Sequence, residues 1–168
     1  MAEDYEGDDK ENLNDPPAFF PYEPGAVERE PGSMGEPVEV QIEGVFAAET
    51  GGQISRFVLL SDGERKLPML IGPFEAQAIS LPLEGTQPDR PMTHDLLRNI
   101  VERLDANLDR VVIDDLWNGI YYAKLYFRRG EEEIEIDARP SDSVAMAVRF
   151  DAPIYVSEGI LDSASEES

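Results

Sequence analysis

The sequence predicts an α+β fold, with a mainly antiparallel sheet and two or three helices packed on one face. Strand-like segments follow one another in pairs joined by short Gly- or Asn-containing turns, which is typical of antiparallel hairpins. Helical periodicity is confined to three separate segments. A hydrophobic content of 41% can build a core, yet no apolar run approaches the roughly 20 residues that a membrane span needs.

A three-stranded meander is predicted over residues 37–72. In residues 37–49 apolar and polar side chains alternate, the period of a half-exposed strand. Thr50-Gly51-Gly52 predicts a hairpin turn into a return strand over residues 53–62. After a second Gly-containing turn comes a third strand, over residues 65–72. Pro68 lies inside it and indicates an edge strand or a bulge, because proline donates no ladder hydrogen bond.

Two helices are expected next. Pro73 suits the first turn of one, and Pro82 should kink or stop it near Leu81 by removing an N–H and crowding the carbonyl of Ala78. The segment MTHDLLRNIVERLDAN, residues 92–107, has its apolar side chains on one face. Thr93 is its expected N-cap.

Asn118-Gly119 between residues 109–117 and 120–129 is a strong hairpin signal, and Arg129-Gly130 predicts a second hairpin into residues 133–138. Two-residue turns would place Tyr122 between Asp115 and Asp137. That arrangement could hold a divalent cation, although most acids in so acidic a chain should simply be solvated.

One face of this meander carries aromatic and basic residues in alternation. Such a face could bind single-stranded nucleic acid. The competing interpretation is an ordinary cross-strand ion pair between Lys124 and Glu135.

The most structured stretch of the sequence is EIEIDARPSDSVAMAVRF, residues 133–150. It predicts a strand, a sharp corner at Arg139-Pro140, and a buried helix, because residues 144–148 are apolar almost all round. Four polar residues lie at that corner: Asp137, Arg139, Ser141 and Asp142.

The chain holds 36 acidic and 14 basic residues, a net charge of −22. Residues 1–36 are expected to be a disordered acidic tail, residues 37–160 the folded domain, and residues 161–168 a frayed acidic C-terminus. Abundant acid, only three lysines and no cysteine resemble the proteins of salt-accumulating halophiles; an ordinary acidic protein is the alternative.

The absence of cysteine excludes disulfides and thiolate metal sites, and it fits a cytoplasmic protein. The acidic N-terminus has no apolar core of the kind found in signal peptides. We therefore expect a cytoplasmic protein without a membrane segment.

Several stretches together resemble one family. LPMLIGPFEAQAISLPLEG, RPMTHDLL, the Asn-Gly hairpin with its tyrosine-rich strand and, above all, IDARPSDSVAMAVR are similar to the bifunctional nuclease domain, from about Pro37 to Ser157. The charge pattern would make this a haloarchaeal-like member. Pro82 departs from the family, whose helix usually continues at that position.

The resemblance implies a nuclease acting on DNA, RNA or both, and a homo-oligomer. It implies catalytic roles for Glu75, His94, Asp137 and Asp142, and substrate binding by Gln77, Arg139 and Ser141; the tyrosine-rich strand adds Tyr122. Mg²⁺ or another divalent cation would be held by Asp137 and Asp142, with oxygen ligands. A non-catalytic oligomeric module that binds a protein or a small ligand is the alternative.

The two central residues also have structural interpretations. His94 could be a general base or a metal ligand, or only a polar residue at a helix start. Arg139 could bind a phosphate, or it could pair with Asp142 or Asp137 and so hold the corner together.

Overall fold

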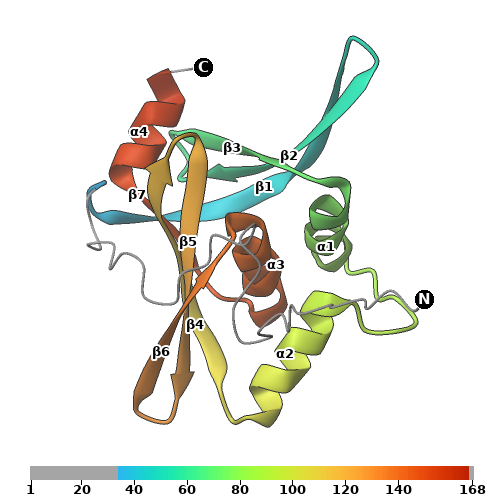
Figure 1. The fold of residues 1–168 in the computed structure, drawn as a ribbon, viewed down its shortest axis with the longest axis vertical. Coiled ribbons are helices and arrows are strands. Elements are labelled where there is room, and N and C mark those ends of the chain that lie inside the picture. The colour runs from blue at the N-terminus through green and yellow to red at the C-terminus, as the bar shows by residue number, and fades with distance from the viewer. Residues whose placement is uncertain (1–33, 167–168) are drawn as a thin grey trace, which may run out of the picture. The chain divides into compact units, whose positions relative to one another are not determined.

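A computed structural model describes residues 34–166 of the chain (Figure 1). In chain order its elements are β1 (Pro37–Thr50), β2 (Gln53–Ser61), β3 (Lys66–Ile71), α1 (Pro73–Leu83), α2 (Thr93–Arg103), β4 (Asn107–Trp117), β5 (Ile120–Arg129), β6 (Glu132–Ala138), α3 (Pro140–Phe150), β7 (Ile154–Ser157) and α4 (Glu158–Glu166).

The strands form one seven-stranded sheet in the order β3-β2-β1-β7-β4-β5-β6. Among the strands of residues 34–166 only β4 and β7 pair in parallel, so the predicted α+β class with a mainly antiparallel sheet is confirmed. Pro68 lies in β3, at one edge of the sheet, as expected from its missing N–H. The described residues contain four helices instead of two or three. Of these, α1, α2 and α3 contact one another through α3, whereas α4 contacts β3 and β7.

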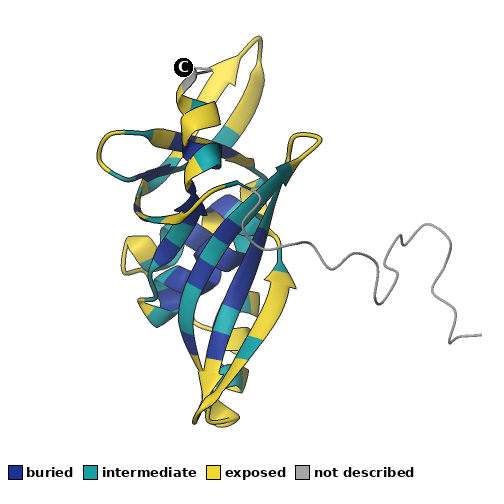
Figure 2. Cartoon of the chain, turned by 90° about the vertical axis from the view of Figure 1, so that its left-hand side faces the viewer, coloured by how far each residue is buried: buried dark blue, intermediate teal, exposed yellow. Residues whose placement is uncertain are grey.

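The core lies where α3 packs on β4 and β5. Val144, Ala145 and Ala147 of α3 are buried against strand residues such as Val111 and Ile113. Figure 2 shows buried positions along these strands and exposed positions at the far end of the β1–β2 hairpin. The prediction of a buried helix after the Arg139-Pro140 corner is therefore confirmed.

The register of the β5–β6 hairpin differs from the prediction by two residues. Its turn is formed by Gly130 and Glu131, so that Arg129 lies opposite Glu132 and Lys124 opposite Asp137. The predicted pairing of Tyr122 with Asp137 is wrong, although a two-residue shift leaves every side chain on its predicted face. Tyr122 does lie opposite Asp115, as predicted, and a bulge at Asp114 then shifts the rest of β4 by one residue.

Helix α1 does not stop at Leu81. It continues through Pro82 to Leu83. A proline leaves the carbonyl four residues earlier without its helical donor, and that carbonyl belongs to Ala78. Nη1 of Arg149, on α3, donates a hydrogen bond to the Ala78 carbonyl at 2.7 Å and replaces the missing N–H.

Helix α2 begins one residue earlier than predicted. Met92, and not Thr93, is the N-cap, and its N–H donates to the Asp95 carboxylate at 2.8 Å. Asp95 therefore caps the helix from its third position, which also suits the positive end of the helix dipole.

The described chain continues beyond the predicted domain limits at both ends. Gly159 N donates to the carbonyl of Met34 at 2.7 Å, and Leu161 on α4 is fully buried. Residues 161–166 are thus helical where fraying was expected, while the predicted tail lies outside the described residues as far as residue 33. None of the helices within residues 34–166 has the length and apolar character to cross a membrane.

Candidate functional site

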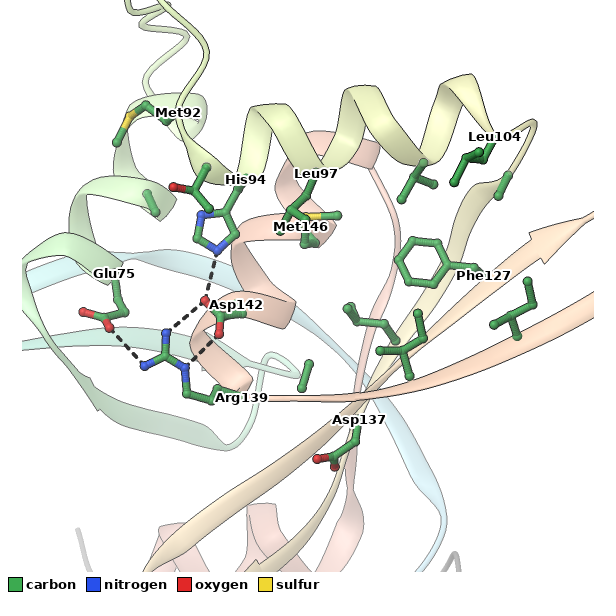
Figure 3. A pocket seen from close by; sticks show the side chains of 18 of the residues that line it. Glu75, Met92, His94, Leu97, Leu104, Phe127, Asp137, Arg139, Asp142 and Met146 are labelled. Carbon is green, nitrogen blue, oxygen red and sulfur yellow. Dashed lines mark hydrogen bonds and ion pairs between the residues drawn. The ribbon is translucent and has the colours of Figure 1, made fainter. Parts of the chain in front are cut away.

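An open cavity of about 900 Å³ lies between α1, α2, α3 and the strands β5 and β6 (Figure 3). The strand-to-helix corner places Arg139 and Asp142 at one end of this cavity. Helix α1 adds Glu75 and the first turn of α2 adds His94. We call these four residues, Glu75, His94, Arg139 and Asp142, the charged end. They come from the starts of three helices that are distant in sequence, with Arg139 and Asp142 both at the start of α3.

Asp142 is the centre of the charged end. Its carboxylate accepts hydrogen bonds from Nε and Nη2 of Arg139 at 2.8 and 3.2 Å, and it lies 3.0 Å from Nε2 of His94. Burial raises the pKa of Asp142, but the hydrogen bonds from Arg139 and His94 outweigh burial and keep this pKa below its ordinary value of 3.8. Asp142 is therefore ionised at neutral pH.

An ionised carboxylate only accepts hydrogen bonds, so Nε2 of His94 must carry the proton that it donates to Asp142. In the neutral imidazole, Nδ1 is then the acceptor, and it points away from Asp142 (Figure 3). The His94 side chain is only 13% exposed, and the bond to Asp142 fixes its orientation. This is the arrangement that a general base needs.

Arg139 bridges two carboxylates. Besides its two bonds to Asp142, Nη1 donates to Oε1 of Glu75 at 3.3 Å. A guanidinium has five N–H donors, so these three bonds leave two for a ligand. The side chain is 66% exposed and can be reached from solvent. Gly72 makes room for this bridge, because a Cβ atom at that position would collide with Oε2 of Glu75.

Most of the residues proposed from sequence meet at this cavity. Its lining includes Glu75, Gln77, His94, Asp137, Arg139 and Asp142. Ser141 and Tyr122 do not line it. Asp137 lies apart from the hydrogen-bonded chain in Figure 3, since alternation along β6 turns it away from the side of Ile136 and Ala138.

Comparison with known proteins decides the family. The model of the bifunctional nuclease domain matches residues 58–168. The chain belongs to the bifunctional nuclease domain family. The resemblance found in the sequence is therefore confirmed at the level of the family.

Relatives of this bifunctional nuclease domain protein fall into two groups. Two uncharacterized proteins from strains of Mycobacterium tuberculosis are 43% identical over 126 residues, which covers 75% of each chain. Bifunctional nuclease 1 of Oryza sativa is 27% identical over 97 residues, covering 56% of this chain and 29% of the rice protein. These relatives give no support to a haloarchaeal origin of the acidity.

The family resemblance implied a divalent cation on Asp137 and Asp142, which both line the cavity. Within residues 34–166 no three His, Asp or Glu side chains are grouped so that they could hold a metal ion. Asp142 already uses both oxygens for Arg139 and His94. A cation bound to the remaining lone pair of Asp142 would lie beside the positive charge of the Arg139 guanidinium.

Arg149 anchors the wall of the site, and the sequence patterns did not predict this role. Its side chain is 4% exposed, and Nε donates to the Asp95 carboxylate at 2.6 Å while Nη1 bonds the carbonyls of Ala78 and Ala145. One guanidinium thus ties α1, α2 and α3 together next to His94. A signal existed in the sequence, because an arginine within an otherwise apolar helix is seldom buried without partners.

The opposite face of β5 does carry the predicted mixture of aromatic and basic side chains, but its cations are engaged. Nζ of Lys124 lies 2.8 Å from the Glu135 carboxylate and 3.6 Å from that of Asp114. Arg110 bonds Glu133 and lies over the ring of Tyr126, 3.9 Å from its centre. The predicted ion pair between Lys124 and Glu135 is confirmed, and this face offers little unpaired positive charge for nucleic acid.

Proposed function

We propose that this protein is a nuclease that hydrolyses phosphodiester bonds of DNA, RNA or both at the charged end of the cavity. One observation carries the proposal: a histidine oriented by an ionised carboxylate lies beside an exposed arginine in an open cavity. These are the groups that activate a nucleophile and hold a phosphate. The name of the rice relative supports the same reaction class.

In the proposed reaction Arg139 holds two phosphate oxygens through its remaining N–H donors. Nδ1 of His94 accepts a proton from a water molecule as the water oxygen bonds to phosphorus. The bond from phosphorus to the ester oxygen breaks, and that oxygen takes a proton from solvent. Asp142 stabilises the imidazolium that forms, because its carboxylate accepts the Nε2 proton in a hydrogen bond.

Three further features belong to this proposal: a divalent cation, a homo-oligomeric state and a cytoplasmic location. Carboxylates at the cavity, including Asp137, are the source of the cation prediction, and the reaction above does not use it. The exposed apolar residues of α2 support an oligomer, since such patches commonly mark contacts between chains. The absence of cysteine fits the reducing cytoplasm.

The proposal is tested by hydrolysis of end-labelled single-stranded DNA and RNA with the full chain, in Mg²⁺ and in EDTA. We expect His94→Gln to lower the rate by about 100-fold or more. Glu49→Gln at the tip of the β1–β2 hairpin, which also replaces a titratable side chain, should behave like wild type. Equal background rates for wild type and His94→Gln would contradict the nuclease, and equal rates in Mg²⁺ and EDTA would contradict the cation.

The second candidate is a non-catalytic oligomeric module that binds a protein or small ligand. It is favoured by α2, in which no residue is buried and Leu96, Leu97, Ile100 and Leu104 are exposed. This candidate predicts no cleavage by wild type under any condition above. It also predicts capture of a specific partner that is lost in Arg139→Ala.

A further inference from the structure

The cavity has two chemically different ends. In Figure 3, Leu97, Met146 and Phe127 lie below α2 and Leu104 lies at its far end, away from the charged end. We call this part the apolar arm; it is lined by Leu97 and Val101 of α2, Leu104 directly after α2, Phe127 of β5, Ile134 of β6 and Met146 of α3. No ionisable side chain belongs to this set.

The apolar arm has buried side chains on one side and exposed side chains on the other. Phe127 and Met146 are buried, whereas Leu97 and Leu104 on α2 are 43% and 62% exposed. A chain with a net charge of −22 thus leaves large apolar side chains facing a cavity. Water in such a space finds few hydrogen-bond partners, so a flat apolar group that displaces it is favoured.

We propose that the apolar arm binds a nucleobase of a single-stranded polynucleotide, next to the phosphate held by Arg139. This inference rests on the proposed nuclease function and names its substrate class. A nucleotide joins an anionic phosphate to a flat ring with apolar faces. The cavity places Arg139, which can bind the phosphate, next to the apolar arm, which can bind the ring. Phe127 lines the arm with an aromatic ring, of which only a small part is accessible to a base because the side chain is 4% exposed.

A second cation supports a polymer over a lone nucleotide. Arg129 also lines the cavity, at the end of β5 beyond Phe127; its Nη2 donates to the Glu132 carboxylate at 2.8 Å, and the same guanidinium keeps further N–H donors. Arg129 lies opposite Glu132, six residues along β6 from Ala138, so the two arginines flank the arm at a separation of about 20 Å. A strand lying along the arm would bring one phosphate to each arginine.

A base that is paired and stacked in a duplex cannot enter the arm, because its faces are covered by its neighbours. Entry requires a single strand or an extruded base, whose unstacking costs free energy. The enzyme should therefore prefer single strands, and it should lose rate where the base beside the cleaved phosphate is missing.

The test uses the full chain with a labelled single strand, the same strand in a duplex, and the same strand with one abasic position. We expect wild type to cleave the single strand about tenfold or more faster than the duplex. Leu97→Trp fills the arm and should lower single-strand kcat/KM by a similar factor, whereas Leu96→Trp should not. Leu96 is the matched control because it is an exposed neighbour on α2 that does not line the cavity.

Binding is measured separately, with a single-stranded oligonucleotide that carries 2-aminopurine and with circular dichroism to verify folding. Equal cleavage of single and double strands, with Leu97→Trp equal to Leu96→Trp, would overturn the inference and leave the nuclease intact. If neither wild type nor either variant cleaves, the nuclease proposal fails. The binding assay then tests whether the apolar arm binds a nucleobase. Base fluorescence that responds to wild type and Leu96→Trp but not to Leu97→Trp supports it, and equal responses overturn it.

Discussion

Arg139 illustrates how much of the charged end depends on the shape of one side chain. Its guanidinium spans the carboxylates of Asp142 and Glu75 and still presents donors to the cavity. A lysine would keep the charge but could not make the two-pronged bond to Asp142 while also reaching Glu75. Positioning, and not charge alone, is therefore what arginine contributes at this site.

Arg139→Lys should separate activity from stability. Because the side chain is exposed, we expect the free energy of unfolding in urea to change by less than about 1 kcal/mol. The rate of hydrolysis should fall about tenfold or more, since the phosphate loses a planar pair of donors. Arg103→Lys, on the last turn of α2, serves as the control. A large loss of stability with normal activity would make Arg139 a structural residue.

Which residues meet at the site could be predicted in part. The corner sequence and the family resemblance led to Glu75, His94, Arg139 and Asp142, which do converge. They did not lead to the partner of each residue, because the choice of Arg139 between Asp142 and Asp137 depends on side-chain rotamers. Asp137 could have been set apart from the sequence itself, since it alternates with Ile136 and Ala138 along β6.

At the scale of elements, α2 is held to the domain largely by polar contacts. No residue of this helix is buried, its main helix contact is with α3, and Asp95 reaches Arg149 while His94 reaches Asp142. Burial raises the pKa of Asp95, but the N–H of Met92 and the Arg149 guanidinium outweigh burial, so this pKa lies below its ordinary value of 3.8. The attachment of α2 should therefore depend on pH.

Below about pH 4 the unfolded chain takes up a proton at Asp95 before the folded chain does. The stabilisation from this pair is thus complete above about pH 4 and is lost as the pH falls through the lower, folded-state pKa. Urea titrations between about pH 3 and 7 should show wild-type stability falling at the acidic end. Asp95→Asn should be less stable at neutral pH by about 1.5–3 kcal/mol and should fall less steeply.

Asp89→Asn, in the exposed loop before α2, is the control for that experiment and should keep the wild-type slope. An unchanged slope in Asp95→Asn would show that α2 is held by other contacts.

Element type and order could be predicted well, but pairing and continuity could not. The register of β5 and β6 was predicted wrongly by two residues. Arg129-Gly130 and Gly130-Glu131 are both acceptable two-residue turns, and both place Ile134 on the core face. The predicted stop at Leu81 failed for a different reason. A donor more than sixty residues away, Arg149, replaces the N–H that Pro82 lacks, and no local pattern contains that information.

The whole molecule carries its acidity over a folded domain as well as over its N-terminal segment. Ion pairs such as Arg65 with Asp162 offset a small part of it, and they lie at the surface, where each contributes about 1 kcal/mol or less. The backbone N–H groups of Arg65 and Glu64 hold the pKa of Asp62 at about 2, so this acid stays charged even in dilute acid. Self-repulsion should therefore limit stability at low salt.

Raising KCl from about 0.05 M to about 2 M should raise the Tm, because the Debye length shrinks to a few ångströms. A gain of about 1 kcal/mol would appear as a rise of roughly 3 °C in a thermal scan. The same series in sucrose controls for effects that do not involve charge. A Tm that falls with KCl would show that the attractive pairs outweigh the repulsion, and it would also count against adaptation to high salt.

The hydrogen bond from Arg149 to the carbonyl of Ala78 links the fates of two distant positions. With Pro82 in place, loss of Arg149 leaves the buried carbonyl of Ala78 without a hydrogen-bond donor. With an ordinary residue at position 82, its backbone N–H would compete for the same carbonyl, and the Arg149 guanidinium would lose one of its partners. Each substitution therefore changes the effect of the other. A lineage could acquire this proline safely only after the arginine was present, so the order of the two changes would be constrained.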